Sequence, residues 1–357
     1  MVCIAAFIIL AIISIFSAKY RKLTGEAWGC VARKLTLRPC DSNFKDDVKN
    51  SILSRVVIKQ PKMVKFTSVA IEVGAFLIVI LTVWSLLVAV KSGISLYVYG
   101  TCEPSNAAAC SLDSSESCSI DKENIGFWDS VIQLKFHVWL GNWLKEYGDA
   151  IVAIPTRIQH WESSDYLPQN ATYKNKYDSS KPTAVDIFDP GCSACRKLYL
   201  NQIKYNFASR YNLAYIAYPI PLKSSDNGYK FKNSLLITQY LEAIRLNPLK
   251  SSDRSVDWKI MERIFGENDS KGVSWQYKID NSMSNSDTEA LLHKWLAEFG
   301  YGTNQVAQIS EVAKSQKVAN IIKSNKKLVT DKIKTVKIPT IIFDGRRYSG
   351  VINNELK

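Results

Sequence analysis

Two cysteines separated by two residues, in the run Cys192-Ser193-Ala194-Cys195, are the residues of this sequence best suited to chemistry. Such a pair can bind zinc, form a structural disulfide, or exchange electrons with other thiols. Structural zinc normally needs four ligands, but the sequence has no second Cys-x-x-Cys motif and its three histidines are isolated. We therefore expect no metal and no cofactor, and the redox and structural roles stay open.

The position of the pair favours the redox role. A short apolar strand, 184–188, ends at the turn Asp189-Pro190-Gly191, and a helical pattern starts directly after Cys192 and runs to about 210. Unpaired backbone N–H groups and the helix dipole stabilise a thiolate at a helix N-terminus. We expect Cys192 to be an exposed attacking thiol and Cys195, one turn further on, to be a shielded resolving thiol within disulfide reach.

The elements that must position this pair read as an α/β domain. A second strand is predicted at 213–220, and helical periodicity dominates from 231 to about 334. The segment 338–343 is a strand opened by a proline, Asp344-Gly345 is a hairpin turn signal, and 346–351 is the partner strand.

Over residues 183–352 the sequence resembles the thioredoxin superfamily and, within it, the DsbA-like branch. Asp186 lies six residues before the first cysteine of the pair, where that family carries a buried acid, and "TVKIPTIIFDGRRYSG" resembles its cis-proline segment. The long helical insertion, about 223–335, resembles the DsbA arrangement rather than that of plain thioredoxin, but it is larger than usual in the family. The predicted fold class is α/β, a thioredoxin-like domain with a large helical insertion, preceded by two transmembrane helices.

The resemblance implies roles for particular residues. Asp186 would relay a proton to and from Cys195, which requires a carboxyl group with a pKa raised by burial. Pro339 would face the cysteine pair, and Ile338 would offer backbone hydrogen bonds to a substrate peptide. Alternatively, Asp186 caps a turn and Pro339 is a trans proline on an edge strand.

Three neighbours of the pair are predicted to set the stability of the Cys192 thiolate. Ser193 and Ala194 supply at most one hydroxyl donor and no imidazolium, and Arg196 adds a positive charge one turn after Cys192. The dipeptide matches neither the Pro-His of strong oxidants nor the Gly-Pro of thioredoxins. The direction of electron flow is therefore not implied by the resemblance.

A formal net charge of +13 would suggest nucleic-acid binding, but the charge is concentrated. Residues 19–66 hold 12 Lys/Arg against 4 Asp/Glu, and this stretch lies between two long apolar runs, 2–18 and 73–90. These runs predict two transmembrane helices, and a signal peptide is the alternative for the first. A basic connecting loop stays cytoplasmic, which places the cysteine pair outside the cytoplasm and excludes nucleic acid as the expected partner.

A helical pattern rich in aromatic residues spans 125–147. It either packs onto the following domain, which we favour, or lies on the outer leaflet as an interfacial helix. Four further cysteines fall on or near the outer side, and we expect up to two disulfides among them, in any of three connectivities, or a relay of electrons to the central pair. Those four are Cys3, Cys102, Cys110 and Cys118, while Cys30 and Cys40 on the cytoplasmic loop are expected to be reduced.

These expectations define six parts and a function. The parts are a transmembrane helix (1–18), a basic cytoplasmic loop (19–66), a transmembrane helix with its outer interface (67–99), a cysteine-containing linker (100–124), an aromatic helix and connection (125–182), and the thioredoxin-like domain (183–357). We expect a membrane-anchored thiol-disulfide oxidoreductase that donates disulfides to exported cysteine-containing proteins. Membrane lipid and a membrane redox partner, either a quinone-linked oxidase or an electron carrier, are the other expected partners.

Two alternatives remain open. The first is a disulfide reductase or isomerase fed by a membrane electron carrier. The second is a non-catalytic membrane interaction module with a structural disulfide.

Overall fold

The computed structural model describes residues 7–9, 11, 21–35, 64–104, 117–120, 125–222, 228–248 and 255–357. The chain divides into two compact units, Met1–Val90 and Lys91–Lys357. The predicted first transmembrane helix, 1–18, lies mostly outside the described residues. Most of the predicted basic loop, 19–66, lies outside them too.

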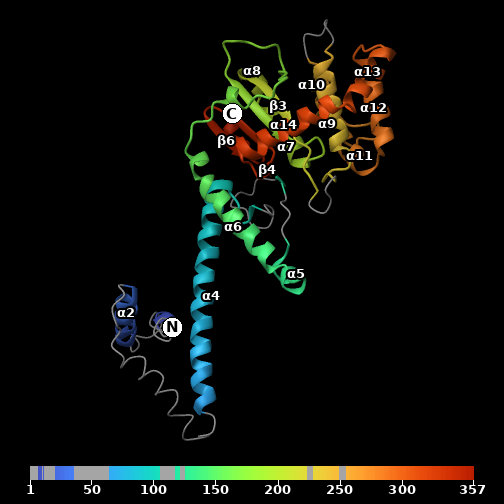
Figure 1. The fold of residues 1–357 in the computed structure, drawn as a ribbon. Helices are drawn as coiled ribbons and strands as arrows, with labels where there is room; N and C mark the ends of the chain where they lie inside the picture. The colour runs from blue at the N-terminus through green and yellow to red at the C-terminus, as the bar shows by residue number, and fades with distance from the viewer. Residues whose placement is uncertain are drawn as a thin grey trace. The chain divides into compact units, whose positions relative to one another are not determined.

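The helices described in the first unit are α2 (Arg21–Leu35) and α4 (Val64–Tyr99), whose last turns belong to the second unit (Figure 1). Within the described ranges, α4 is the one helix long and apolar enough to cross a membrane, judged by length and composition. Large apolar side chains such as Leu81 and Leu86 are exposed along it. The second predicted membrane helix is therefore a helix of suitable length, while an anchor of two helices is not established.

A four-stranded mixed sheet lies at the centre of the second unit. Its order is β3-β2-β5-β6, from β2 (Thr183–Phe188), β3 (Asn212–Ala217), β5 (Thr340–Phe343) and β6 (Arg346–Ser349). Strands β2 and β3 are parallel, whereas β5 is antiparallel to both of its neighbours. Every residue of β3 is buried, as expected of an apolar strand covered on both faces.

Local sequence signals explain the two connections that shape this sheet. The β2–β3 crossover carries α7 (Ser193–Lys204) and the short α8 (Phe207–Arg210), because parallel neighbours need a long return path. The β5–β6 hairpin turns at Asp344 and Gly345, both at positive φ, which is the backbone that a two-residue turn of this type requires. The Ile338–Pro339 peptide bond is cis, so the trans alternative is wrong. This topology confirms the predicted thioredoxin-like fold for the second unit.

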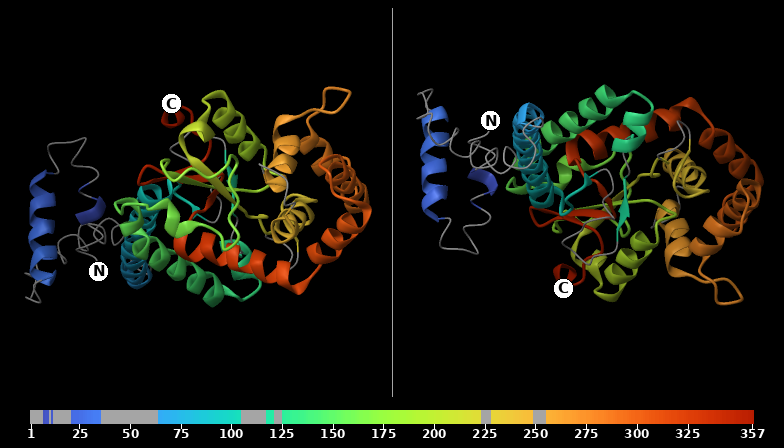
Figure 2. Two further views of the ribbon diagram at one scale, coloured as in Figure 1. Left: turned by 90° about the horizontal axis from the view of Figure 1, so that it is seen from above. Right: turned by 90° about the horizontal axis from the view of Figure 1, so that it is seen from below.

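Helices form nearly all of the described insertion between β3 and β4, as predicted. In Figure 2 these helices, coloured yellow to red-orange, gather to one side of the sheet. Asp257 links the insertion to β3, because its carboxylate accepts a hydrogen bond from the Tyr215 hydroxyl at 2.8 Å. Within the insertion, the same carboxylate accepts a hydrogen bond from Arg245 at 2.9 Å. The helices are α9 (Ser234–Leu246), α10 (Val256–Gly266), α11 (Trp275–Asn281), α12 (Asn285–Glu298), α13 (Thr303–Ala313), α14 (Gln316–Lys327) and the π-helix η6 (Leu328–Ile333).

The predicted aromatic helix is two helices, α5 (Phe127–Ile132) and α6 (Phe136–Val152). The break occurs at Leu134, whose φ of 55° ends regular helix. Trp128 and Ile132 are 73% and 77% exposed, so the packing that the sequence favoured does not cover these side chains. Two 3₁₀ turns, η4 (Ile154–Arg157) and η5 (Ser163–Tyr166), lead from α6 to β2, and a third, η7 (Asn354–Leu356), follows β6.

Part of the predicted linker is structured. β1 (Cys118–Ser119) pairs antiparallel with β4 (Lys337–Ile338), the segment just before cis-Pro339. Ile120 continues the pairing, since its N–H donates to the Val336 carbonyl at 3.0 Å. The linker interpretation of 100–124 is therefore wrong for its residues 118–120, which carry no periodic pattern that a strand prediction could use.

Candidate active site

The cysteine pair lies at the start of α7, immediately after the turn that ends β2. Cys192 is the N-cap residue, with extended backbone angles, and Cys195 is in the first turn of the helix. The Cys195 N–H donates to the Cys192 carbonyl at 3.0 Å, which closes that turn. The sequence-predicted placement of the pair at a strand-to-helix junction is therefore what the structure shows.

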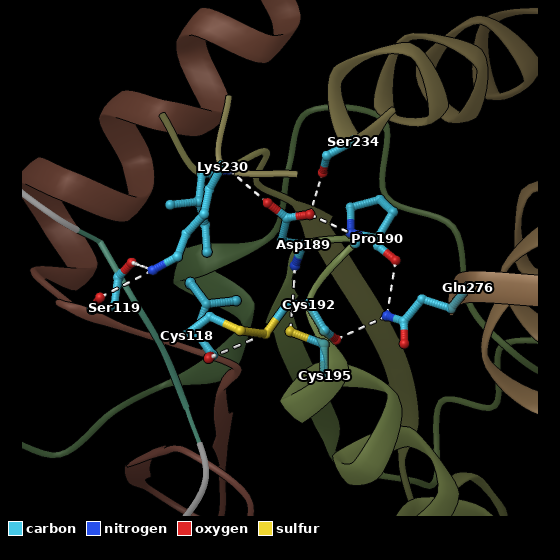
Figure 3. Close-up of a disulfide and its surroundings, with 12 residues drawn as sticks. Cys118, Ser119, Asp189, Pro190, Cys192, Cys195, Lys230, Ser234 and Gln276 are labelled. Atoms are coloured by element: carbon cyan, nitrogen blue, oxygen red, sulfur yellow. Dashed lines mark hydrogen bonds between the residues drawn. A yellow bond between two sulfur atoms is a disulfide. The ribbon is translucent and has the colours of Figure 1, made fainter. Parts of the chain in front are cut away.

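Cys192 forms a disulfide with Cys118 rather than with Cys195 (Figure 3). The S–S distance is 2.00 Å, and 74 residues separate the two cysteines in sequence. Cys192 has no exposed surface and Cys195 remains a free, buried thiol. The expectation of an exposed Cys192 is thus wrong for this state, because the Cys118 segment covers the sulfur.

This disulfide also corrects the expected pairing of the outer cysteines. Cys118 bonds outside the group of four to which the sequence assigned it, and Cys102 is disulfide-bonded as well. The electron-relay alternative is untested. Three of the remaining cysteines lie outside the described residues, namely Cys3, Cys40 and Cys110, and of Cys30 only the helical backbone is described.

The strand that carries Cys118 lies against the residue that was predicted to bind a substrate backbone. Cys118 pairs in register with Ile338, and Ser119 pairs with Lys337. The Ile338 carbonyl oxygen lies 3.7 Å from the Cys192 sulfur. Cis-Pro339 follows directly, so Ile338 and Pro339 lie beside the first cysteine of the pair, as the resemblance implied.

A lysine from the start of the insertion holds the same strand. The Lys230 ammonium group lies 3.3 Å from the Ser119 carbonyl oxygen and 3.2 Å from its hydroxyl oxygen. Figure 3 shows Lys230 reaching Ser119 on the Cys118 side of the disulfide. The covering strand is therefore bound by a disulfide, a short β-pairing and a charge-assisted contact.

Cys195 lies on the other side of the helix start, among carboxyl groups. The Asp189 backbone N–H donates a hydrogen bond to its sulfur at 3.5 Å. Burial raises the pKa of the Cys195 thiol well above 9, and the carboxylates of Asp189 and Asp186 raise it further against the opposing effect of that N–H. Cys195 is accordingly a protonated thiol that must lose its proton before it can attack.

Asp186 is the predicted buried acid, and the structure places it in the middle of β2. Burial raises its pKa to about 7, while a hydrogen bond from the Gln202 side-chain amide at 2.9 Å and the charge of Lys174 act in the opposite direction. Its Oδ1 atom is buried and has no hydrogen-bond partner among the described residues. This carboxyl group does not cap a turn, and near neutral pH it can either bind or release a proton.

Asp189 is a second buried acid that the sequence analysis used only as a turn signal. Its carboxylate accepts hydrogen bonds from the Gly191 N–H at 2.8 Å, the Ile220 N–H at 2.6 Å and the Ser234 hydroxyl. Burial raises its pKa to about 7 against these three hydrogen bonds. The Asp-Pro-Gly sequence explains a turn by itself, so nothing local distinguished this side chain as a buried one.

Gln276, on α11, joins the insertion to the active-site turn. Its side-chain amide donates to the Pro190 carbonyl at 3.0 Å and to the Cys192 carbonyl at 2.9 Å (Figure 3). Gln276 itself is buried. No sequence signal could have identified it, because it lies 84 residues beyond Cys192 in a helix with no unusual composition.

The three residues predicted to tune the thiolate are placed differently from one another. Ser193 is exposed, Ala194 is buried, and Arg196 is half-buried with its backbone N–H donating to the Cys192 carbonyl at 3.2 Å. The Arg196 Nε is buried without a hydrogen-bond partner within the described ranges. Their effect on Cys192 stays a prediction.

Metal binding finds no support in the described part of the chain, where no group of three or more His, Cys, Asp or Glu side chains is arranged to hold an ion. The chemistry that this arrangement can perform is thiol-disulfide exchange. It brings together one disulfide, one free thiol next to it on the same helix turn, and two carboxyl groups that exchange protons near neutral pH.

No protein-family model matches the chain, and no curated protein matches it either. Solved structures with similar folds include α-DsbA1 from Wolbachia pipientis, with 14% identity, a TM-score of 0.37, and coverage of 55% of this chain and 91% of that one. MdbA, a thiol-disulfide oxidoreductase from Corynebacterium diphtheriae, has 15% identity, a TM-score of 0.37, and coverage of 55% and 97%. A thioredoxin-like oxidoreductase from Silicibacter pomeroyi has 15% identity, a TM-score of 0.36, and coverage of 54% and 91%.

Proposed function

We propose that this chain is a membrane-anchored protein thiol-disulfide oxidoreductase that exchanges disulfides with cysteine-containing proteins outside the cytoplasm. The observation that carries the proposal is the disulfide on Cys192 next to the free thiol of Cys195 in the first turn of α7. Thiol-disulfide exchange passes through a mixed disulfide that a second thiol then resolves. A disulfide and a free thiol in the same helix turn support this mechanism.

The site also has a place for a substrate backbone. The segment that bonds to Cys192 is extended and pairs antiparallel with Lys337 and Ile338, just before cis-Pro339. Another extended peptide with a cysteine can pair with the same edge, where backbone hydrogen bonds bind it irrespective of its sequence. An unfolded exported protein is a substrate of this kind.

Disulfide donation is the direction that we propose. Two substrate thiols would reduce the Cys192–Cys195 disulfide to two thiols and become a disulfide, and a quinone-linked oxidase or another electron carrier in the membrane would accept the two electrons. α4 supports an attachment beside such a partner, since it is long and apolar enough to span a bilayer. The exposed apolar side chains of α5 and α6 support contact with membrane lipid.

A test of the function uses the full chain purified in detergent, as wild type and as Cys118→Ser, which leaves Cys192 free to pair with Cys195. After oxidation, the chain is mixed with a dithiol peptide, quenched with acid and alkylated. We expect the peptide disulfide to form as the Cys192–Cys195 disulfide is lost, and Cys192→Ser to abolish the transfer. If oxidised Cys118→Ser transfers nothing, the enzymatic proposal is wrong.

The direction is tested by the potential of the Cys192–Cys195 pair in the same Cys118→Ser chain, equilibrated with glutathione buffers. We expect roughly −150 to −230 mV, between DsbA and thioredoxin, since the helix start stabilises the thiolate without an imidazolium. A potential of about −270 mV would favour a reductase or isomerase that receives electrons from a membrane carrier.

A non-catalytic interaction module is the second candidate. Complete burial of Cys192 in its bond to Cys118 favours it, because a disulfide that closes a long loop can serve stability alone. A Cys118–Cys192 disulfide with a potential below about −300 mV, unreactive toward Cys195, would establish this alternative.

The location is tested in cells with a membrane-impermeant maleimide. Lys317 on α14 is exposed, so Lys317→Cys provides an accessible thiol on the thioredoxin-like domain. We expect this cysteine to react in intact spheroplasts and Cys30 and Cys40 to react only after lysis. Reaction of the two loop cysteines in intact spheroplasts would reverse the proposed topology.

A further inference from the structure

We propose that Cys118 is a third redox-active cysteine, carried on an internal strand that occupies the substrate position and keeps the site closed until Cys195 displaces it. This inference rests on the proposed function and adds a regulatory step to it. No external cysteine can bond to Cys192 while Cys118 occupies its sulfur.

The internal strand occupies the edge that a substrate strand would use. Cys118 is in register with Ile338, and the Ile120 N–H donates to Val336 at 3.0 Å, so the pairing extends over three consecutive residues. Ser119 and Ile120 are buried, at 5% and 8% exposure. Two strands cannot hydrogen-bond to the same edge of β4 at once. Substrate binding and the internal strand therefore exclude each other.

Apart from the disulfide, the strand is held by a short pairing, by Lys230 and by the Ile120 side chain, which is buried in the hydrophobic core. β1 contributes two residues to a two-stranded sheet, and a pairing of this size is marginal in water. The Lys230 contacts to Ser119, at 3.3 and 3.2 Å, add a charge-assisted interaction. Breaking the Cys118–Cys192 bond should thus allow the strand to leave, whereas the bond keeps it in place.

Cys195 lies in the first turn of the helix that Cys192 begins, and Figure 3 shows its sulfur beside the disulfide. The Cys195 sulfur loses its proton and attacks the Cys192 sulfur, forming the Cys192–Cys195 bond as the Cys118–Cys192 bond breaks. Cys118 departs as a thiolate and takes up a proton. One disulfide and one thiol are present before and after, so the exchange needs no external oxidant or reductant. Asp186 and Asp189 beside Cys195 are groups that can accept its proton.

The chain then has two forms at the same level of oxidation. In the closed form Cys118 is bonded to Cys192, and in the open form Cys192 is bonded to Cys195 and the edge of β4 is free. Cys192 is fully buried in the closed form, so a substrate dithiol should reduce the open form much faster than the closed form, although each form holds one disulfide at this site. The observed rate is therefore lowered by the fraction of molecules in the closed form.

The experiment uses the full chain in detergent, oxidised and acid-quenched, with disulfides mapped by mass spectrometry of a non-reduced digest. The rate of dithiol-peptide oxidation is measured on the same samples. The variants are Cys118→Ser, which cannot close, and Ile120→Pro, which keeps every cysteine but removes the N–H that donates to Val336. Cys40→Ser is the control, as a cysteine change far from this site in sequence.

We expect both disulfides in the wild type and Cys192–Cys195 alone in Cys118→Ser. Peptide oxidation should be about fivefold or more faster in Cys118→Ser, as expected if most molecules are closed. Ile120→Pro should shift the mapped disulfides toward Cys192–Cys195 and raise the rate in proportion, and Cys40→Ser should match the wild type.

Three different results would each contradict the inference. If Cys118→Ser oxidises the peptide at the wild-type rate, the closed form does not limit access and only the proposed function stands. If no variant oxidises the peptide and Cys118–Cys192 is the single disulfide of this site in the wild type, the bond is structural and the proposed function fails as well. An unchanged disulfide ratio in Ile120→Pro would show that the strand pairing does not hold the closed form.

Discussion

The first turn of α7 separates two different environments, one around each cysteine. Cys192 is surrounded by backbone carbonyls and by extended chain, with Ile338 on one side and the Gln276 amide fixing its own carbonyl on the other. Cys195 lies among buried carboxyl groups, Asp189 and Asp186, which act on its pKa. We therefore propose that the Cys192 side binds a peptide and that the carboxyl groups on the Cys195 side exchange protons with its thiol.

This difference explains how two chemically identical thiols can have different roles. Thiol-disulfide exchange with a partner protein requires space for an extended segment and groups that orient it. The Cys192 side supplies both. Resolution of the mixed disulfide requires that the buried Cys195 thiol lose its proton before it attacks. Carboxyl groups with pKa values near neutrality on the Cys195 side can accept that proton. Variants of the two cysteines, of the two acids and of Gln276 test that division.

Trapping of substrates should be all or none. In the Cys118→Ser background, Cys195→Ala should accumulate mixed disulfides between Cys192 and exported proteins, because the resolving thiol is gone. Cys192→Ala in the same background should accumulate none, since Cys195 is buried. Non-reducing gels of acid-quenched cells measure both. Equal trapping by the two variants would abolish the proposed division of roles.

Removal of the Asp189 carboxylate should cost most in stability. Asp189→Ala leaves the Gly191 N–H, the Ile220 N–H and the Ser234 hydroxyl without their acceptor. We expect a loss of about 2 to 4 kcal/mol, since each unsatisfied buried donor costs about 1 kcal/mol or more. Urea unfolding followed by tryptophan fluorescence measures it, and Asp189→Asn, which keeps one acceptor oxygen, should fall between Ala and wild type. If Asp189→Ala leaves the stability unchanged, this acid is not a structural hydrogen-bond acceptor.

Asp186→Asn should increase the stability of the folded state, which is opposite in sign to the effect of Asp189→Ala. Above pH 7 the wild type holds a buried carboxylate with an unpaired Oδ1, and an amide avoids the cost of that charge. We expect a gain of about 2 kcal/mol at pH 8, together with resolution by Cys195 slowed about tenfold or more. Quenched-flow alkylation measures the resolution step. A destabilised variant with normal exchange rates would assign Asp186 a purely structural role.

The pH dependence of stability follows from the same two acids. Their pKa values in the folded state, about 7, lie above the unfolded value of 3.8, so the folded state binds more protons between these limits. Stability should therefore rise as pH falls from about 8 to about 5, and this contribution is lost as pH rises through 7. Urea midpoints across that range should show a smaller slope in Asp186→Asn. An unchanged slope would mean that Asp186 does not titrate in this range.

Gln276→Ala should change the stability least among these variants. It removes the amide that donates to the carbonyls of Pro190 and Cys192, which costs about 1 to 2 kcal/mol. Loosening the active-site turn should also change the Cys192–Cys195 potential measured in the Cys118→Ser background. Gln276→Glu, of nearly the same shape but without the donor, is the matched comparison. A potential unchanged in both variants would confine Gln276 to packing.

Much of the fold could be predicted because its signals are local. The apolar run of β2, the turn after it and the helical pattern from Ser193 place Cys192 at a helix start, and Asp344-Gly345 defines the β5–β6 hairpin. Each signal is a backbone preference or a short period of apolar residues, which a few neighbours decide. Asp186 was identified only through the family resemblance, which places a buried acid six residues before the first cysteine of the pair.

The sequence by itself thus determined that a cysteine pair lies at the start of a helix, while the tertiary structure decided what each cysteine meets. Cys118 lies 74 residues before Cys192 in a segment without periodicity, and Gln276 lies 84 residues after it. Asp189 is marked by its sequence only as part of a turn, yet folding buries it against Ile220 and Ser234. Long-range partners are chosen by the packing of the whole sheet and insertion, because no local backbone preference depends on them.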